Sequence, residues 1–178
     1  MIIKILSILG ALVAGLLIYA GLKKPDMEIT REVLIKATPE KLFPFINNSQ
    51  KSNDWMPWKD SDPGVNMTYT GPMEGVGSRS SWESKGKMGI GNAEVIQSVN
   101  NLTVKTKLEY TKPMVMSQIA TISLTPSSKG ETLVRWSVNG HNSFIFRLFG
   151  ILYSMDKMVG GEFEKGLAKL KKMAEMEK

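Results

Sequence analysis

The chain has 178 residues and carries 23 lysines and arginines against 17 aspartates and glutamates, with one histidine and no cysteine. Lys4, Lys23 and Lys24 surround an apolar N-terminal run, and the other 20 basic and 17 acidic side chains are nearly balanced. That balance excludes the strongly basic surface of a nucleic-acid-binding protein. One imidazole and no thiol are too few for a conventional zinc site, and we expect neither a metal nor a cofactor.

The N-terminal run, residues 5–22, has 18 residues without a charge. A helix of that length is about 27 Å long, close to the roughly 30 Å of a bilayer's hydrocarbon core. A cleaved signal peptide is the alternative, but Ile18 is bulky at the position where a cleavage motif requires a small residue. We therefore predict a transmembrane anchor over residues 1–24 and one domain over residues 25–178.

The side of the membrane that this domain occupies is left open by the sequence. Lys23 and Lys24 outweigh Lys4, which by the positive-inside rule favours the cytoplasmic side. A short N-terminus ahead of a lone apolar segment is also how exported, anchored domains begin, and we favour the exported side.

After Pro25, the alternation of residues 28–37 predicts a strand. Thr38 as N-cap and Pro39 as first helical residue then begin a short helix, and a second helical turn leads to Trp55. Six further strands are predicted at residues 65–69, 78–83, 91–99, 102–110, 114–125 and 132–138. Strands joined by short turns pair antiparallel, so we expect an antiparallel sheet.

The chain ends in an amphipathic helix, predicted over residues 152–176. Phe163, Leu167, Leu170 and Ala174 recur at helical spacing and therefore share one face of this helix. In the strand before it, every second residue from Thr132 to Val138 lies on the same side. A strand with one such face, followed by a helix with an apolar face, indicates that the helix lies across the sheet.

Several motifs carry a resemblance to a known family. They are residues 37–43 (ATPEKLF), 55–58 (WMPW), 75–77 (GVG), 81–83 (SWE), 134–138 (VRWSV) and 155–167 (MDKMVGGEFEKGL). With them, residues 28–174 resemble the SRPBCC (START-like) superfamily, in particular its polyketide cyclase/dehydrase-like branch. The resemblance implies an α+β helix-grip fold, a curved antiparallel sheet of about seven strands wrapped around a long C-terminal helix, preceded here by the transmembrane helix.

The same resemblance implies an apolar cavity, which members of the superfamily use for lipid transport, hormone binding or polyketide cyclisation. Aromatic and thioether side chains would form soft walls for an apolar ligand. The candidate wall residues are Trp55, Trp58, Tyr69, Trp82, Tyr110, Trp136, Met155 and Gly160. Core packing is the alternative for each aromatic ring, and Gly160 could instead admit a close-packed strand.

Residues suited to catalysis are few. His141, the single imidazole, is predicted to lie solvated in a loop after the last strand. Asp156 and Glu162 could act as general acids only if they faced a cavity. Arg79 and Arg135 are out of phase with their aromatic neighbours and are expected to point outward. We therefore name no catalytic residue.

Residues 144–153 form an apolar segment in which eight of ten residues are large and apolar. They could form a helix packed against the domain. Alternatively they form the lip of the cavity and enter the membrane interface, with Phe144, Phe146 and Phe149 as the membrane-contact candidates.

The function we favour from the sequence is a membrane-anchored, monomeric binding or carrier domain for a hydrophobic small molecule or lipid. A cyclase/dehydrase-type enzyme and a protein-interaction module on the same fold are the alternatives. An enzyme would place ionisable residues inside the cavity, whereas an interaction module would have a cavity too small for a ligand. The sequence does not identify the ligand.

Overall fold

The computed structural model describes residues 2–128, 130–141, 143–152 and 154–176, with the side chains of residues 3, 146, 149, 152 and 155 left out. The helices are α1 (Ile2–Leu22), α2 (Pro39–Asn47), α3 (Ser49–Trp55), α4 (Trp58–Ser61), α5 (Phe144–Leu152) and α6 (Met155–Met176). The strands are β1 (Asp26–Ile35), β2 (Asn66–Thr70), β3 (Arg79–Glu83), β4 (Ile90–Val99), β5 (Thr103–Lys112), β6 (Met116–Pro126) and β7 (Thr132–His141).

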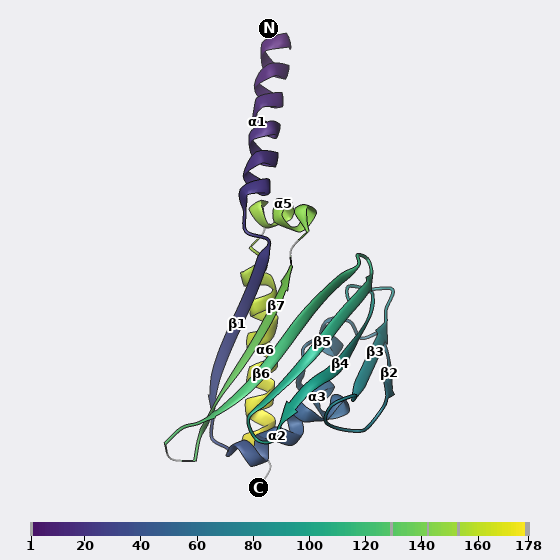
Figure 1. The fold of residues 1–178 in the computed structure, drawn as a ribbon, viewed down its shortest axis with the longest axis vertical. Coiled ribbons are helices and arrows are strands. Elements are labelled where there is room, and N and C mark those ends of the chain that lie inside the picture. The colour runs from purple at the N-terminus through teal and green to yellow at the C-terminus, as the bar shows by residue number, and fades with distance from the viewer. Residues whose placement is uncertain (1, 129, 142, 153, 177–178) are drawn as a thin grey trace.

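The strands form one seven-stranded sheet in the order β1-β7-β6-β5-β4-β3-β2, and every neighbouring pair is antiparallel. The sheet curves, and α6 runs behind β1, β7 and β6 (Figure 1). This is the predicted α+β helix-grip arrangement. The ends of the strands differ from those predicted by no more than three residues.

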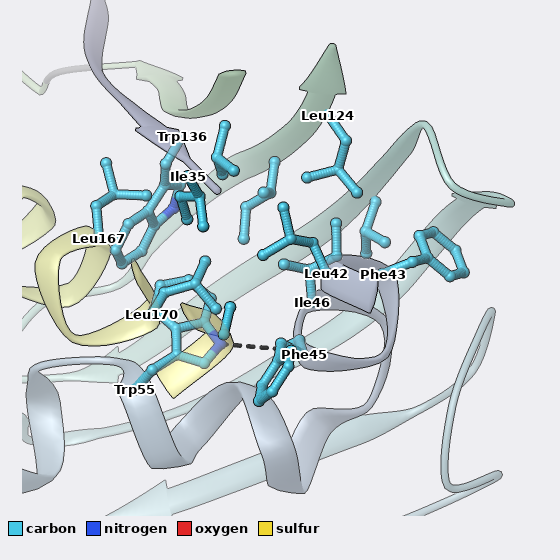
Figure 2. Close-up of a cluster of buried hydrophobic side chains, with 14 of the residues drawn as sticks. Ile35, Leu42, Phe43, Phe45, Ile46, Trp55, Leu124, Trp136, Leu167 and Leu170 are labelled. Atoms are coloured by element: carbon cyan, nitrogen blue, oxygen red, sulfur yellow. Dashed lines mark hydrogen bonds between the residues drawn. The ribbon is translucent and has the colours of Figure 1, made fainter. Parts of the chain in front are cut away.

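The core lies between the sheet and α6. Alternate residues of β7, including Val134 and Trp136, are buried on the face that meets the helix. The predicted apolar face of α6 is buried as well, and Leu167 and Leu170 lie beside Trp136 and Trp55 in Figure 2. The two periodicities, two residues in the strand and 3.6 in the helix, therefore meet in one cluster.

A short helical layer closes the other side of this core. The side chain of Asn48 caps α3 by accepting hydrogen bonds from the backbone N–H groups of Gln50 and Lys51 at 3.0 and 3.1 Å. This cap turns α3 so that Trp55 is buried and its indole Nε1 donates to the carbonyl oxygen of Phe45 at 2.9 Å (Figure 2). Thr38 occupies the predicted N-cap position of α2, but its side chain makes no cap hydrogen bond.

The apolar N-terminus forms the helix α1, whose side chains are almost all exposed. Among the described residues, one helical stretch, Lys4–Leu22, is long enough and apolar enough to cross a membrane. The helix α5 lies across the end of α1 (Figure 1). Arg147 of α5 donates from Nη1 to the carbonyl oxygens of Gly21 and Lys23, both at 3.0 Å.

Two predictions about the C-terminal third are wrong in detail. The predicted helix over residues 152–176 begins later, at Met155, and a separate helix α5 precedes it. His141 lies not in a loop but at the end of β7, opposite Asp26 of β1. Its side chain is exposed, as predicted.

Candidate functional site: an apolar cleft at the open side of the sheet

A cleft of about 240 Å³ opens between the helices α3 and α4, strand β2 and the loop before β4. Its lining residues are mostly aromatic or apolar, and they are Asn53, Trp58, Lys59, Val65, Met67, Tyr69 and Met88. Met67 and Tyr69 alternate along β2, so both side chains point to the same face of the sheet. A mostly apolar hollow with few polar groups is the usual form of a small-molecule site.

The cleft adjoins the aromatic core. The ring of Trp58 meets the edge of Trp136 at a centroid distance of 6.3 Å. On the outer side, Asn53 donates from Nδ2 to the hydroxyl oxygen of Tyr69 at 3.2 Å. That hydrogen bond links α3 to β2 across the cleft and leaves polar atoms at its rim.

Trp82 and Tyr110 form a second aromatic pair beside this cleft, with ring centroids 5.4 Å apart. Trp82 donates from Nε1 to the carbonyl oxygen of Met88 at 3.2 Å, which holds the loop that carries Met88. The pair depends on Gly91, because a Cβ there would lie 2.4 Å from the Trp82 ring. Burial raises the pKa of Tyr110, so its hydroxyl stays neutral at physiological pH.

The loop between β3 and β4, residues 84–89, is fastened to α4 by Asp62. The buried Asp62 carboxylate accepts hydrogen bonds from Ser84 Oγ at 2.7 Å and from the Met88 backbone N–H at 3.0 Å. These hydrogen bonds lower the pKa of Asp62 below its ordinary value of 3.8, and the bond from the Met88 N–H has the largest effect. Asp62 therefore fixes one wall of the cleft while it is ionised.

We expect Asp62→Asn to loosen this loop, because the amide cannot reproduce both charge-assisted hydrogen bonds. The Met88 amide should exchange with solvent about tenfold faster than in the wild type at neutral pH. Because folding lowers the pKa of Asp62, the ionised carboxylate contributes its full stabilisation at pH values well above 3.8. This stabilisation is lost as the pH falls through the lower pKa of the folded state. Urea unfolding of the wild type and the variant at several pH values would check this. The stability gap should narrow in acid, and a gap independent of pH would contradict the role of the carboxylate.

The residues predicted to form the cavity wall do not all lie at the cleft. Trp58 and Tyr69 line the cleft, and Trp82 and Tyr110 lie beside it. Trp55 and Trp136 are packed inside the core, with 0 % and 2 % of their surfaces exposed. The side chain of Met155 lies outside the described part of the chain. The sequence reasoning overlooked Asp62 and Met67, although the alternation with Tyr69 on β2 could have revealed Met67.

Gly160 does not border the cleft. A Cβ at this position would lie 2.0 Å from Nη2 of Arg31, so the glycine accommodates an arginine from β1. This agrees with the alternative of close packing against a strand. Arg31 in turn forms ion pairs with Asp156 at 3.0 Å and with Glu164 at 2.6 Å, which join β1 to α6.

The two carboxylates considered as general acids, Asp156 and Glu162, are both ion-paired and neither lines the apolar cleft. The hydrogen bonds and charge of Arg31 hold the pKa of Asp156 below its ordinary value, so it is a carboxylate at neutral pH. Glu162 is ion-paired with Lys165 at 2.7 Å and accepts a hydrogen bond from Ser61. Arg79 and Arg135 point outward and pair with Glu94 and Glu32, respectively. Within the described ranges, no group of three or more histidines and carboxylates could hold a metal.

A curved antiparallel sheet that encloses a C-terminal helix, with an apolar cleft at its open side, defines a protein of the helix-grip class. The family described as polyketide cyclase / dehydrase and lipid transport matches residues 26–175. The chain belongs to this family, which confirms the resemblance drawn from the sequence. A search of curated proteins finds no match.

Solved structures from several organisms share this fold. The truncated norcoclaurine synthase of Thalictrum flavum is 16% identical over 86% of this chain and 96% of its own, with a TM-score of 0.65. A protein of Chromobacterium violaceum is 15% identical over 83% and 96% of the two chains, with a TM-score of 0.61. The Aha1 dimer of Colwellia psychrerythraea is 21% identical over 85% and 98%, with a TM-score of 0.56. At these identities the likeness concerns the fold alone.

Proposed function

We propose that this protein is a membrane-anchored binding or carrier domain for a hydrophobic small molecule or lipid. In this proposal α1 spans the bilayer once and holds a monomeric domain close to its surface, on the exported side. The ligand occupies the cleft between α3, α4 and β2. The observation that carries the proposal is the lining of that cleft, in which Trp58, Met67 and Tyr69 present apolar surface around a hollow of about 240 Å³.

The size of the cleft limits the ligand. Its volume is slightly below the roughly 300–1,000 Å³ typical of small-molecule pockets. It therefore suits a small apolar molecule, or one apolar end of a longer one. The flexible thioethers of Met67 and Met88 can adjust to different shapes, as methionine does at permissive binding surfaces.

The polar groups at the cleft suit binding better than catalysis. Among the residues described as lining it, none is a carboxylate, an imidazole or a nucleophilic hydroxyl with an adjacent base. Asn53, Lys59 and the Tyr69 hydroxyl can hold a polar group at the rim. This arrangement supports a ligand with an apolar body and one polar end.

The proposal is tested on the fragment 25–178 with N-phenyl-1-naphthylamine, an uncharged apolar probe. We expect saturable binding and a change in tryptophan emission from Trp58. Met67→Gln should raise the Kd about tenfold, because it replaces apolar wall with an amide that must be desolvated. Met73→Gln is the matched control, since Met73 lies outside the cleft and is 73% exposed. If the fragment binds no probe, or if both variants bind it as the wild type does, the cleft is not the ligand site.

A further inference from the structure

The polar side chains that line the apolar cleft offer mainly hydrogen-bond donors. The Tyr69 hydroxyl oxygen accepts a hydrogen bond from Asn53 Nδ2 at 3.2 Å, so the proton of this hydroxyl is directed elsewhere and can be donated. The Asn53 amide carries two hydrogens on Nδ2, and the second is available for another acceptor. Lys59 also lines the cleft and adds an ammonium, which donates but cannot accept. A ligand group held here must therefore accept hydrogen bonds.

Lys59 is the one charged side chain among the described residues that line the cleft. It is exposed, and it forms no hydrogen bond or ion pair within the described ranges. The neighbouring carboxylate of Asp60 is bonded to Lys169 at 2.9 Å. An ammonium beside an apolar hollow attracts an anion more strongly than one in open water, because the effective dielectric constant is lower there. The charge at the cleft is thus positive and lacks a partner.

The loop of residues 84–89, which contributes Met88 to the cleft, does not offset this positive charge. Its two ionisable side chains, Lys85 and Lys87, are both exposed and basic. The Asp62 carboxylate accepts from the Met88 N–H and does not line the cleft. The Met88 carbonyl oxygen accepts from the indole of Trp82. Both backbone groups of Met88 are therefore occupied, and this loop offers the ligand an apolar thioether.

We propose that the cleft selects apolar acids, that is, molecules with an apolar body and one singly charged anionic group, of which a carboxylate is the simplest. The inference rests on the proposed function, because it names the class of ligand that the same cleft takes. The apolar body lies against Trp58 and Met67, and the anionic group lies at the rim. There it accepts hydrogen bonds from Lys59 and the Tyr69 hydroxyl, whereas a cationic ligand would meet Lys59 with no carboxylate in the lining to balance it.

Three compounds that share one apolar body test this selection. They are 4-phenylbutanoate, 4-phenylbutan-1-ol and 4-phenylbutylamine, which at neutral pH are an anion, a neutral molecule and a cation. Each is titrated by calorimetry into the full chain in phosphatidylcholine nanodiscs, and the heat measured with empty nanodiscs is subtracted. The wild type should bind the acid about fivefold more tightly than the alcohol and should bind the amine most weakly.

Variants of Lys59 show whether its charge causes the preference. Lys59→Met keeps an apolar stem without the ammonium and should remove the preference for the acid over the alcohol. Lys59→Arg keeps the charge and should retain the preference. Lys172→Met is the matched control, because Lys172 is exposed on α6 and does not line the cleft. It should show the wild-type ratio of the two affinities.

The outcomes separate this inference from the proposed function. If the wild type binds the acid and the alcohol equally, or binds the amine best, the cleft takes apolar molecules but does not select acids. Equal loss of the acid preference in Lys59→Met and Lys172→Met would reveal attraction by the net positive charge of the chain and would also overturn the inference. If none of the three compounds binds and N-phenyl-1-naphthylamine does not bind either, the proposed function fails, and this inference fails with it.

Discussion

Trp136→Ala is expected to destabilise the domain by about 4 kcal/mol, because removal of a buried tryptophan loses its burial and leaves a cavity. The Trp136 ring stacks on Phe163 with centroids 3.9 Å apart and receives the edge of Trp55 at 5.3 Å. Gly166 of α6 packs onto the same ring, since a Cβ there would lie 3.0 Å from it. The Trp136 ring is contacted by both α6 and α3, so small shifts of one element cannot fill the cavity that its removal leaves. Urea unfolding of the fragment 25–178 measures the effect.

Substitutions by phenylalanine provide the control for Trp136→Ala. The Nε1 atom of Trp136 is buried and has no hydrogen-bond partner among the described residues, so Trp136→Phe should cost only about 1 kcal/mol. Trp55→Phe should cost about 1 kcal/mol more than that, because Trp55 donates to Phe45. A loss below 1 kcal/mol for Trp136→Ala would show that the aromatic cluster is not the centre of the core.

Replacement of Phe144 and Ile145 by serine is expected to weaken the binding of the fragment 25–178 to liposomes about tenfold. These side chains of α5 are 41% and 52% exposed, and α5 lies across the end of the proposed anchor. A helix in that position lies in the plane of the membrane interface when α1 crosses the bilayer. Co-sedimentation with vesicles measures the binding, and thermal melting shows whether the fold is kept.

Val115→Ser is the matched control for the α5 substitution, since Val115 is 88% exposed and lies between β5 and β6. It should leave vesicle binding unchanged. If the α5 double variant binds as the control does, or if its melting temperature collapses, α5 is packing surface and not a membrane contact. The side chains of Phe146 and Phe149, the other membrane-contact candidates, lie outside those that the structure describes. No described residue of α5 lines the apolar cleft, and the lip of the cavity expected at residues 144–153 stays a prediction.

The sequence predicted the strands well because most of them have one face that is more buried and one that is solvated. In β5, for example, Val104 and Leu108 point inward between lysines, and this alternation is visible without any structure. The sequence pattern did not predict the boundary between α5 and α6, because the apolar run there has no polar face to mark the end of a helix. Helix ends within such a run are set by what they pack against, here the end of α1.

The candidate site was harder to predict because core and cleft use the same residue types. Trp55 and Trp58 are three residues apart in one motif, yet one is fully buried and the other lines the cleft. Trp55 ends α3 and its indole is bonded to the carbonyl oxygen of Phe45, whereas Trp58 begins α4, which borders the cleft. Asp62 was missed for a related reason, since its partners Ser84 and Met88 are more than twenty residues away and no local pattern connects them.

The pairing of β1 with β7 has a mechanical consequence. β1 follows directly after α1 and continues away from it along the long axis of the molecule (Figure 1). Its ten residues pair one for one with β7, from Asp26 opposite His141 to Ile35 opposite Thr132. Tension between a lipid-embedded α1 and the rest of the domain would therefore load this ladder in shear, along the strands. All of its hydrogen bonds would resist together and not open one after another, so the tether joins the domain at a place suited to bear force.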